Sequence, residues 1–115
     1  MTAEQARGRQ ANPIRGEAAF RVAGHDRILR PTFAALVAAE EELGPLFALV
    51  ERAGAGKLRL TELAALFWYC LADRNGLSRE DVGEAVVASG LAGCAPAVRV
   101  LLGQILRGRA WPARA

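Results

Sequence analysis

Few side chains in this 115-residue sequence could carry out catalysis or hold a metal ion. The chain contains one histidine, His25, and two cysteines, Cys70 and Cys94, which lie far apart. Nucleophilic catalysis requires a serine or cysteine beside a base, and zinc sites usually take closely spaced Cys or His pairs. His25 lies in a turn-forming stretch, while Ser78 and Ser89 lie where a helix is expected to begin or end. We therefore expect no enzyme activity, no catalytic residue, no metal and no cofactor.

Two short segments are similar to ligand-binding loops but lack the residues that such loops need. In Ala53–Leu58 (AGAGKL), a phosphate loop would need a glycine where Glu51 stands and a Ser or Thr where Leu58 stands. The segment DRNG, which begins at Asp73, has its glycine at the fourth position, whereas a calcium-binding EF-hand loop needs it at the sixth. We predict a helix connector and a helix–helix turn at these two places.

Length and composition predict one globular domain. Apolar residues make up 52% of the chain and charged residues 23%, which is typical of a folded protein with a packed core. The longest apolar run, 63–72, is half of the roughly 20 residues that cross a bilayer, so we expect no membrane span. The first residues lack the apolar segment of a secretion signal. We therefore expect a cytoplasmic protein in which Cys70 and Cys94 are buried free thiols.

The net charge of +3 is unevenly distributed. Residues 1–98 carry 11 basic and 12 acidic residues, a net charge of −1, whereas residues 99–115 carry four arginines and no acid, a net charge of +4. A nucleic-acid-binding face would need basic residues clustered on the folded body, so nucleic acid is not the partner we expect. The alternative is a small helical nucleic-acid-binding or regulatory protein that uses the basic tail with Arg107, Arg109, Trp111 and Arg114.

The elements that must position these residues begin with a hairpin. Ala18, Phe20 and Val22 alternate with more polar residues, as in a half-buried strand. The turn is expected within Ala23–Asp26, with His25 as a turn residue, and a second strand follows over 27–30. A two-residue turn at Gly24-His25 would set Phe20 opposite Leu29, and a longer turn would set it opposite Arg30. We favour the first register because it pairs two apolar side chains.

Helical patterns fill the rest of the chain. Helical spacing of apolar residues, together with start and stop signals, predicts helices at about 32–43, 45–52, 61–73, 79–89 and 94–107. Ser78 and Asp81 have the spacing of a capping box, and Gly90 marks a helix end. The predicted fold is α+β and mainly α, with an N-terminal two-stranded β-hairpin packed on four to five short helices. We expect a flexible arm over 1–13, a single domain over 14–107 and a flexible basic tail over 108–115.

The helix at 61–73 is apolar on nearly all sides, which places it at the centre of the domain. Trp68 and Tyr69 are expected in the core with it. The other residues chosen for the core come from both strands and from the remaining helices. They are Phe20, Val22, Leu29, Phe33, Leu36, Leu63, Phe67, Val86 and Leu102.

A set of residues over 12–44 carries a family resemblance. They are Asn12-Pro13, Arg15-Gly16-Glu17, Gly24, Leu29-Arg30, Thr32-Phe33, Leu36, Glu40 and Leu43-Gly44, followed by short apolar helices. The sequence resembles the gene transfer agent family proteins of phage-like tail gene clusters, which are classed as tail assembly chaperones and also labelled as tail tube proteins. The similarity covers about residues 12–107 and leaves the start of the chain and the basic tail outside it.

The resemblance implies a protein-binding role and brings no catalytic residues with it. The expected partner is a tail tape-measure protein or a tail tube protein, and a homo-oligomer is possible. Three candidate contact surfaces are the hairpin edge, the acidic end of the first helix and the C-terminal tail. Their residues are Arg21, Arg27, Glu40, Glu41, Glu42, Arg107, Arg109 and Trp111.

Overall fold

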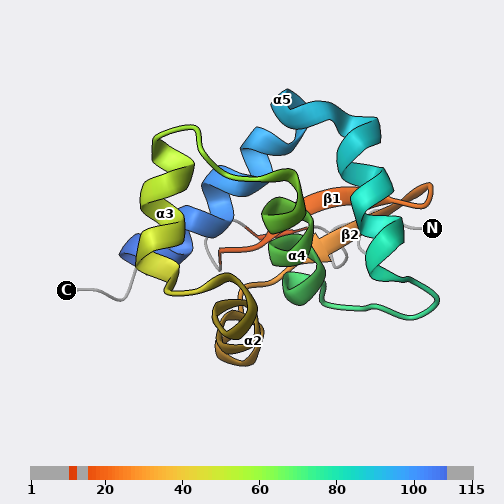
Figure 1. The fold of residues 1–115 in the computed structure, drawn as a ribbon. Helices are drawn as coiled ribbons and strands as arrows, with labels where there is room; N and C mark the ends of the chain where they lie inside the picture. The colour runs from red at the N-terminus through yellow and green to blue at the C-terminus, as the bar shows by residue number, and fades with distance from the viewer. Residues whose placement is uncertain (1–10, 13–15, 109–115) are drawn as a thin grey trace.

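The computed structural model describes residues 11–12 and 16–108, and within them the fold is α+β and mainly α. The predicted arm 1–13 and tail 108–115 lie mostly outside these ranges. An N-terminal antiparallel hairpin is followed by helices that surround a central one (Figure 1). The elements are β1 (Ala18–Val22), β2 (His25–Leu29), α2 (Phe33–Leu43), α3 (Leu46–Gly54), α4 (Leu60–Cys70) and α5 (Arg79–Arg107).

The hairpin is present, but both registers considered for it are wrong. Phe20 faces Arg27, and Val22 faces His25. The turn is therefore Ala23-Gly24, whose φ angles of 52° and 80° are both positive, as a type I′ turn requires. Positive φ is uncommon for alanine, so the sequence favoured placing the turn one residue later. His25 is consequently an exposed residue at the start of β2 rather than part of the turn.

A buried carboxylate closes the start of the hairpin. Glu17, which the alternation puts on the polar side of β1, is only 4% exposed. Its carboxylate accepts hydrogen bonds from Arg30 Nε at 2.7 Å and from the backbone N–H of Asn12 at 3.0 Å. A buried charge is costly without a partner, and Arg30 at the end of β2 provides one.

The outer edge of β2 is joined to the end of α4. Leu29 and Leu71 form an antiparallel bridge, in which the Arg30 N–H donates to Cys70 O at 2.6 Å and the Ala72 N–H donates to Ile28 O at 2.9 Å. The helix therefore ends at Cys70, whereas the sequence predicted about Asp73. The chain leaves the helix early, and the backbone of residues 70–72 makes these bridge hydrogen bonds instead.

The centre of the domain is α4, as predicted. In Figure 1 it lies between α3 and the first part of α5, in front of the hairpin. Most of its residues are buried: Leu63, Ala64, Ala65, Leu66, Phe67 and Cys70. The ring of Phe67 packs edge-on against Phe20 of β1, with 4.7 Å between ring centroids. Trp68 and Tyr69 are half-buried and pack against this core from its margin.

The two predicted C-terminal helices form one bent element, α5. Gly90 has φ 75° and ψ 160°, which breaks the helix where the sequence predicted an end. The second half begins directly after Gly90, whereas the sequence predicted that it would begin at about residue 94. Ser78 and Asp81 form the predicted capping box, with the Ser78 N–H donating to Asp81 Oδ2 at 2.8 Å and the Asp81 N–H to Ser78 Oγ at 3.1 Å.

By length and composition alone, α5 could cross a membrane. The bend at Gly90 divides it into two parts, each shorter than the roughly 20 residues that a crossing needs. Both parts contribute fully buried side chains to the core, among them Val86 before the bend and Leu101 after it. Only 28% of the most apolar window of α5 is buried, so the helix packs some of its side chains on the core and leaves most of this window outside it.

The core contains six of the nine residues chosen from the sequence as buried, namely Phe20, Val22, Leu29, Leu63, Phe67 and Val86. Leu36 and Leu102 are partly buried at its margin. Phe33 is wrong, because its side chain is 85% exposed. The Thr32 cap was placed correctly, since Thr32 Oγ1 accepts from the Ala35 N–H at 3.1 Å. The start of this helix is therefore fixed, but its first residue points outward.

The bend gives a stability prediction. Gly90 occupies a region of φ and ψ that is open almost only to glycine, so Gly90→Ala should lower the free energy of unfolding by about 1–3 kcal/mol. Gly83→Ala is the matched control. Gly83 is helical with open space at its Cβ position, so alanine there should raise stability by up to about 1 kcal/mol. Urea unfolding followed by circular dichroism measures both, and equal effects would contradict the assignment of the bend to Gly90.

Candidate protein-interaction surface

The three glutamates at the acidic end of α2, which was predicted as a contact surface, make different contacts. Glu42 binds inward, accepting from Arg79 Nη1 at 2.8 Å and from the Tyr69 hydroxyl at 2.6 Å. Glu40 accepts from the backbone N–H of Leu46 at 3.1 Å, at the start of α3. Glu41 is exposed and has no bonded partner in the described part of the chain. Glu41 is thus the residue of this face most available to another molecule.

The contacts of Glu42 brace three helices. The hydrogen bonds from Arg79 and, next, from Tyr69 hold the pKa of the Glu42 carboxyl below its ordinary value of 4.5, and the same contact raises the pKa of Arg79. The Arg79 guanidinium also lies 5.2 Å from the centre of the Tyr69 ring. Because these residues come from α2, α4 and α5, the cluster is a structural connection that sequence spacing gave no means of predicting.

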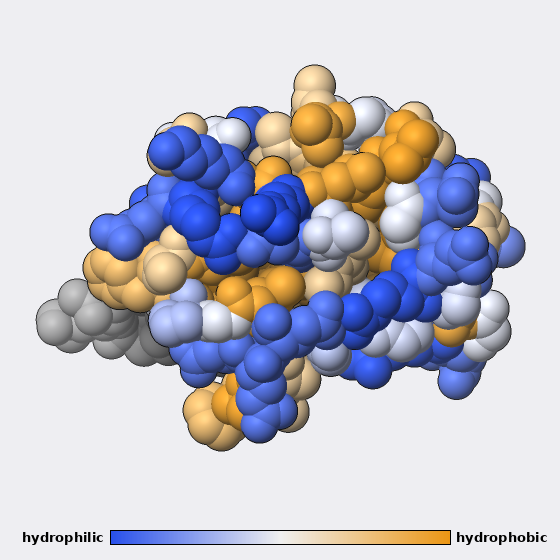
Figure 2. All heavy atoms as spheres, viewed as in Figure 1, coloured by the Kyte–Doolittle hydropathy of each residue, from blue (hydrophilic) through white to orange (hydrophobic). Residues whose placement is uncertain are grey.

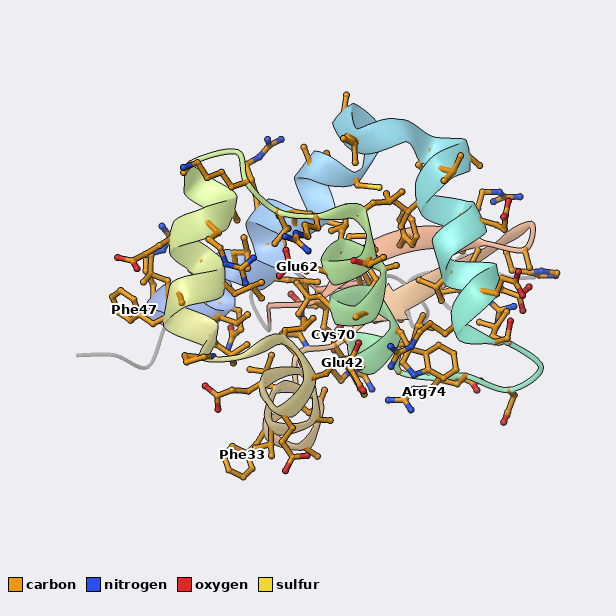
Figure 3. The ribbon with its side chains drawn as sticks, viewed as in Figure 1. Phe33, Glu42, Phe47, Glu62, Cys70 and Arg74 are labelled. Carbon is orange, nitrogen blue, oxygen red and sulfur yellow. The ribbon has the colours of Figure 1, made fainter. Side chains whose placement is uncertain are left out.

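A second brace holds α3 against α4. The Glu62 carboxylate accepts from the Arg59 backbone N–H at 2.9 Å and from Arg52 Nη1 at 2.5 Å. The backbone bond and then the Arg52 bond keep the pKa of Glu62 below its ordinary value. Glu62 is labelled in Figure 3 on the side of α4 that faces α3. The Arg52–Glu62 ion pair therefore stabilises the packing of α3 on α4, and Arg52 is not free to bind another molecule.

The charged residues of the hairpin are partly used within it. Arg21 forms a salt bridge with Asp26 at 3.0 Å and donates a hydrogen bond to Gly24 O at 2.7 Å, and both contacts stabilise the exposed turn. Arg27 is half-buried, and its Nε is buried with no hydrogen-bond partner among the described residues. His25 places Nδ1 3.1 Å from Ala23 O. The structure therefore keeps Arg21 and Arg27 on one hairpin but does not bring them to the acidic end of α2.

The last turn of α5 forms a basic surface. Arg99 and Arg107 line a pocket of about 360 Å³ together with Pro96, Val100 and Gln104, and none of the described residues that line it is acidic. Arg109 and Trp111, the other predicted contact residues of the tail, lie outside the described residues, as does Arg114. Only Arg107 of this predicted surface can therefore be placed, and it is exposed.

Exposed apolar side chains are the surface feature that the sequence reasoning missed. Phe33 is 85% exposed, Phe47 67% and Val37 38%. Figure 3 shows Phe33 on α2 and Phe47 on α3 pointing away from the body of the molecule. A signal was available in the sequence, because the apolar residues of α2 do not lie on one side of the helix. Such a helix is usually covered on more than one side.

The cysteines are free, as predicted, and both are buried. Burial raises the pKa of the Cys70 thiol to about 12 and also raises that of Cys94. No group of three or more His, Cys, Asp or Glu side chains lies close enough to hold a metal among the described residues.

Comparison with known families identifies the chain. A family model matches residues 15–108, which include the hairpin and all the described helices. The chain belongs to this family of phage tail proteins. The family is described as phage tail tube protein, GTA-gp10, so the resemblance to gene transfer agent tail proteins is confirmed. No curated protein and no solved structure matches the sequence significantly.

The Glu42 brace gives a pH-dependent prediction. Since the pKa of Glu42 is lowered on folding, its carboxylate stabilises the protein above pH 4.5, and this contribution is lost as the pH falls through the folded-state pKa. Glu42→Gln should therefore lower the urea midpoint at pH 7, and the difference from wild type should narrow below pH 4.5. Glu41→Gln, which removes no bonded contact, should change the midpoint little at either pH. Equal losses in the two variants would contradict the brace.

The buried thiols give a reactivity prediction. At pH 8 a thiol with a pKa of about 12 is almost entirely protonated, and the thiolate is the reactive form. Neither Cys70 nor Cys94 should react with a thiol reagent such as DTNB in the folded protein, whereas both should react in concentrated urea. Rapid labelling of either cysteine before unfolding would show that the site is open to solvent.

Proposed function

We propose that this protein is a non-enzymatic binding module in the tail assembly of a prophage or gene transfer agent. In this proposal it acts in the cytoplasm, where it chaperones the tape-measure protein or joins tail tube assembly. The observation that carries the proposal is the exposure of Phe33 and Phe47 on neighbouring helices of a chain that belongs to a tail protein family.

The physical support comes from the size and placement of the exposed side chains. Single apolar residues on a surface are common, but large aromatic ones that project from two adjacent helices favour a binding surface. Figure 2 shows apolar surface at α2, at α3 and over the bend of α5. Burying such side chains against a long apolar client would keep that client soluble. The same surface could instead join a tail tube subunit.

Co-expression tests the proposal. The protein is produced with the tape-measure protein or with the tail tube protein of the same gene cluster, and the soluble yield and co-purification of each partner are measured. A chaperone should raise the soluble yield of the tape-measure protein several-fold and elute with it. A tube component should instead co-elute with the tail tube protein in a larger assembly.

The nucleic-acid alternative predicts a different result. Binding to duplex DNA should then be tight, should fall steeply with salt and should vanish when residues 107–115 are deleted. Such binding, with no complex to either tail protein, would overturn the proposed function.

A further inference from the structure

Three residues form an outward ridge along α2. Phe33, Val37 and Glu41 are spaced four residues apart, and four residues advance an α-helix by one turn plus about 40°, so the three side chains follow one another along the helix. Each is exposed, Phe33 by 85% and Val37 by 38%. We call these three residues the outer ridge of α2.

The opposite side of α2 attaches it to the body through Ala35 and Ala39, with Leu36 and Leu43 partly buried beside them. Its buried residues are Ala35 and Ala39, which are 8% and 0% exposed. A surface helix normally turns its larger apolar residues inward and its polar residues outward. In α2, Ala35 and Ala39 face the core while Phe33 is 85% exposed and Val37 38%, so these two apolar side chains keep exposed surface that the described chain does not cover.

The charge at the end of the ridge has one sign and no neutralising contact. Glu41 has no bonded partner in the described part of the chain, and α2 contains no basic residue. A carboxylate near a helix C-terminus is also repelled by the negative end of the helix dipole. A cation placed there would therefore neutralise the Glu41 charge and remove this repulsion. The same order recurs on α3, where exposed Phe47 is followed four residues later by exposed Glu51.

We propose that the outer ridge of α2 docks an amphipathic helix of a partner tail protein. The helix that fits runs parallel to α2 and has two apolar residues four positions apart, followed one turn later by lysine or arginine. The apolar pair would cover Phe33 and Val37, and the basic residue would neutralise Glu41. This inference rests on the proposed function, because it names the chemistry of the partner and the surface that receives it.

The charge pattern disfavours a second copy of the chain as the occupant. If two copies of α2 paired antiparallel, Phe33 would meet the carboxylate of Glu41 from the other copy. If they paired in parallel, two Glu41 carboxylates would face each other without a cation. A basic amphipathic helix satisfies both ends of the ridge at once.

The first test uses the complex obtained by co-expression. Phe33→Ser and Glu41→Lys should each weaken the complex by about tenfold or more, as expected for loss of an apolar anchor and for charge reversal. Leu91→Ser is the matched control, since Leu91 is 67% exposed but lies beside the bend of α5, far from α2 in Figure 1. A photo-crosslinker at position 33 should label a basic helical segment of the partner, and reversing the basic residue there should restore binding to Glu41→Lys.

A second test does not depend on finding the natural partner. Two synthetic helical peptides carry leucine, leucine and lysine, or leucine, leucine and glutamate, at positions i, i+4 and i+8. Fluorescence anisotropy should show several-fold tighter binding of the lysine peptide to wild type and a reversed preference for Glu41→Lys. Because Phe33 and Glu41 are exposed, these variants should keep the wild-type urea midpoint.

The outcomes separate this inference from the proposed function. A complex that Leu91→Ser weakens but Phe33→Ser and Glu41→Lys do not would overturn the ridge and leave the tail assembly role standing. Equal binding of the two peptides would overturn the ridge as well. Sedimentation that shows a dimer of the wild type, lost in Phe33→Ser, would assign the ridge to a second copy and refute the proposed occupant.

Discussion

Two backbone hydrogen bonds between β2 and the residues that follow α4 hold the rest of the fold in place. A two-stranded hairpin is barely stable alone, and a helix that is apolar on nearly all sides must be covered on all of them. The bridge from Leu29 to Leu71 meets both needs, because it fixes the hairpin against the end of the central helix. Phe20 can then contact Phe67. The two halves of α5 and the shorter helices α2 and α3 cover the remaining sides of this core.

The other polar contacts secure elements that the core alone holds weakly. Glu42 joins α2 to α4 and α5, Glu62 joins α4 to α3, and Glu17 joins the start of β1 to Arg30 at the end of β2. Three of the charged residues predicted as contact residues, Arg21, Glu40 and Glu42, are therefore used within the fold. The described side chains left over for recognition include the exposed apolar ones with Glu41 beside them, and Arg107 at the end of α5.

Local sequence signals predicted most of the helices and strands. The hairpin register, the inward side of α2 and the roles of its acidic residues depend on contacts between distant residues, which the sequence does not show. The Ser78–Asp81 box predicted the start of α5 and Gly90 predicted its bend, because capping and positive φ depend on neighbouring residues. The hairpin register could not be predicted, since alanine at Ala23 gives no sign of its positive φ. The spacing of Phe33 fits a buried stripe, but α2 has apolar residues on more than one side, and the packing of Ala35 shows which of these sides faces inward. The division of labour among Glu40, Glu41 and Glu42 likewise depends on residues far along the chain.

The alanine side of α2 also affects how strongly any partner could be held. Ala35, Ala39 and the partly buried Leu36 and Leu43 bury less apolar area than the six buried residues of α4, so opening α2 alone exposes less surface to water than opening α4 would. Local opening of α2 is therefore a low-energy event compared with global unfolding. A partner that binds the ordered helix must offset the cost of keeping it ordered, which couples affinity to the local stability of α2. Positions 35 and 39, on the side away from the docking surface, thus become places where binding strength can be tuned without touching the partner.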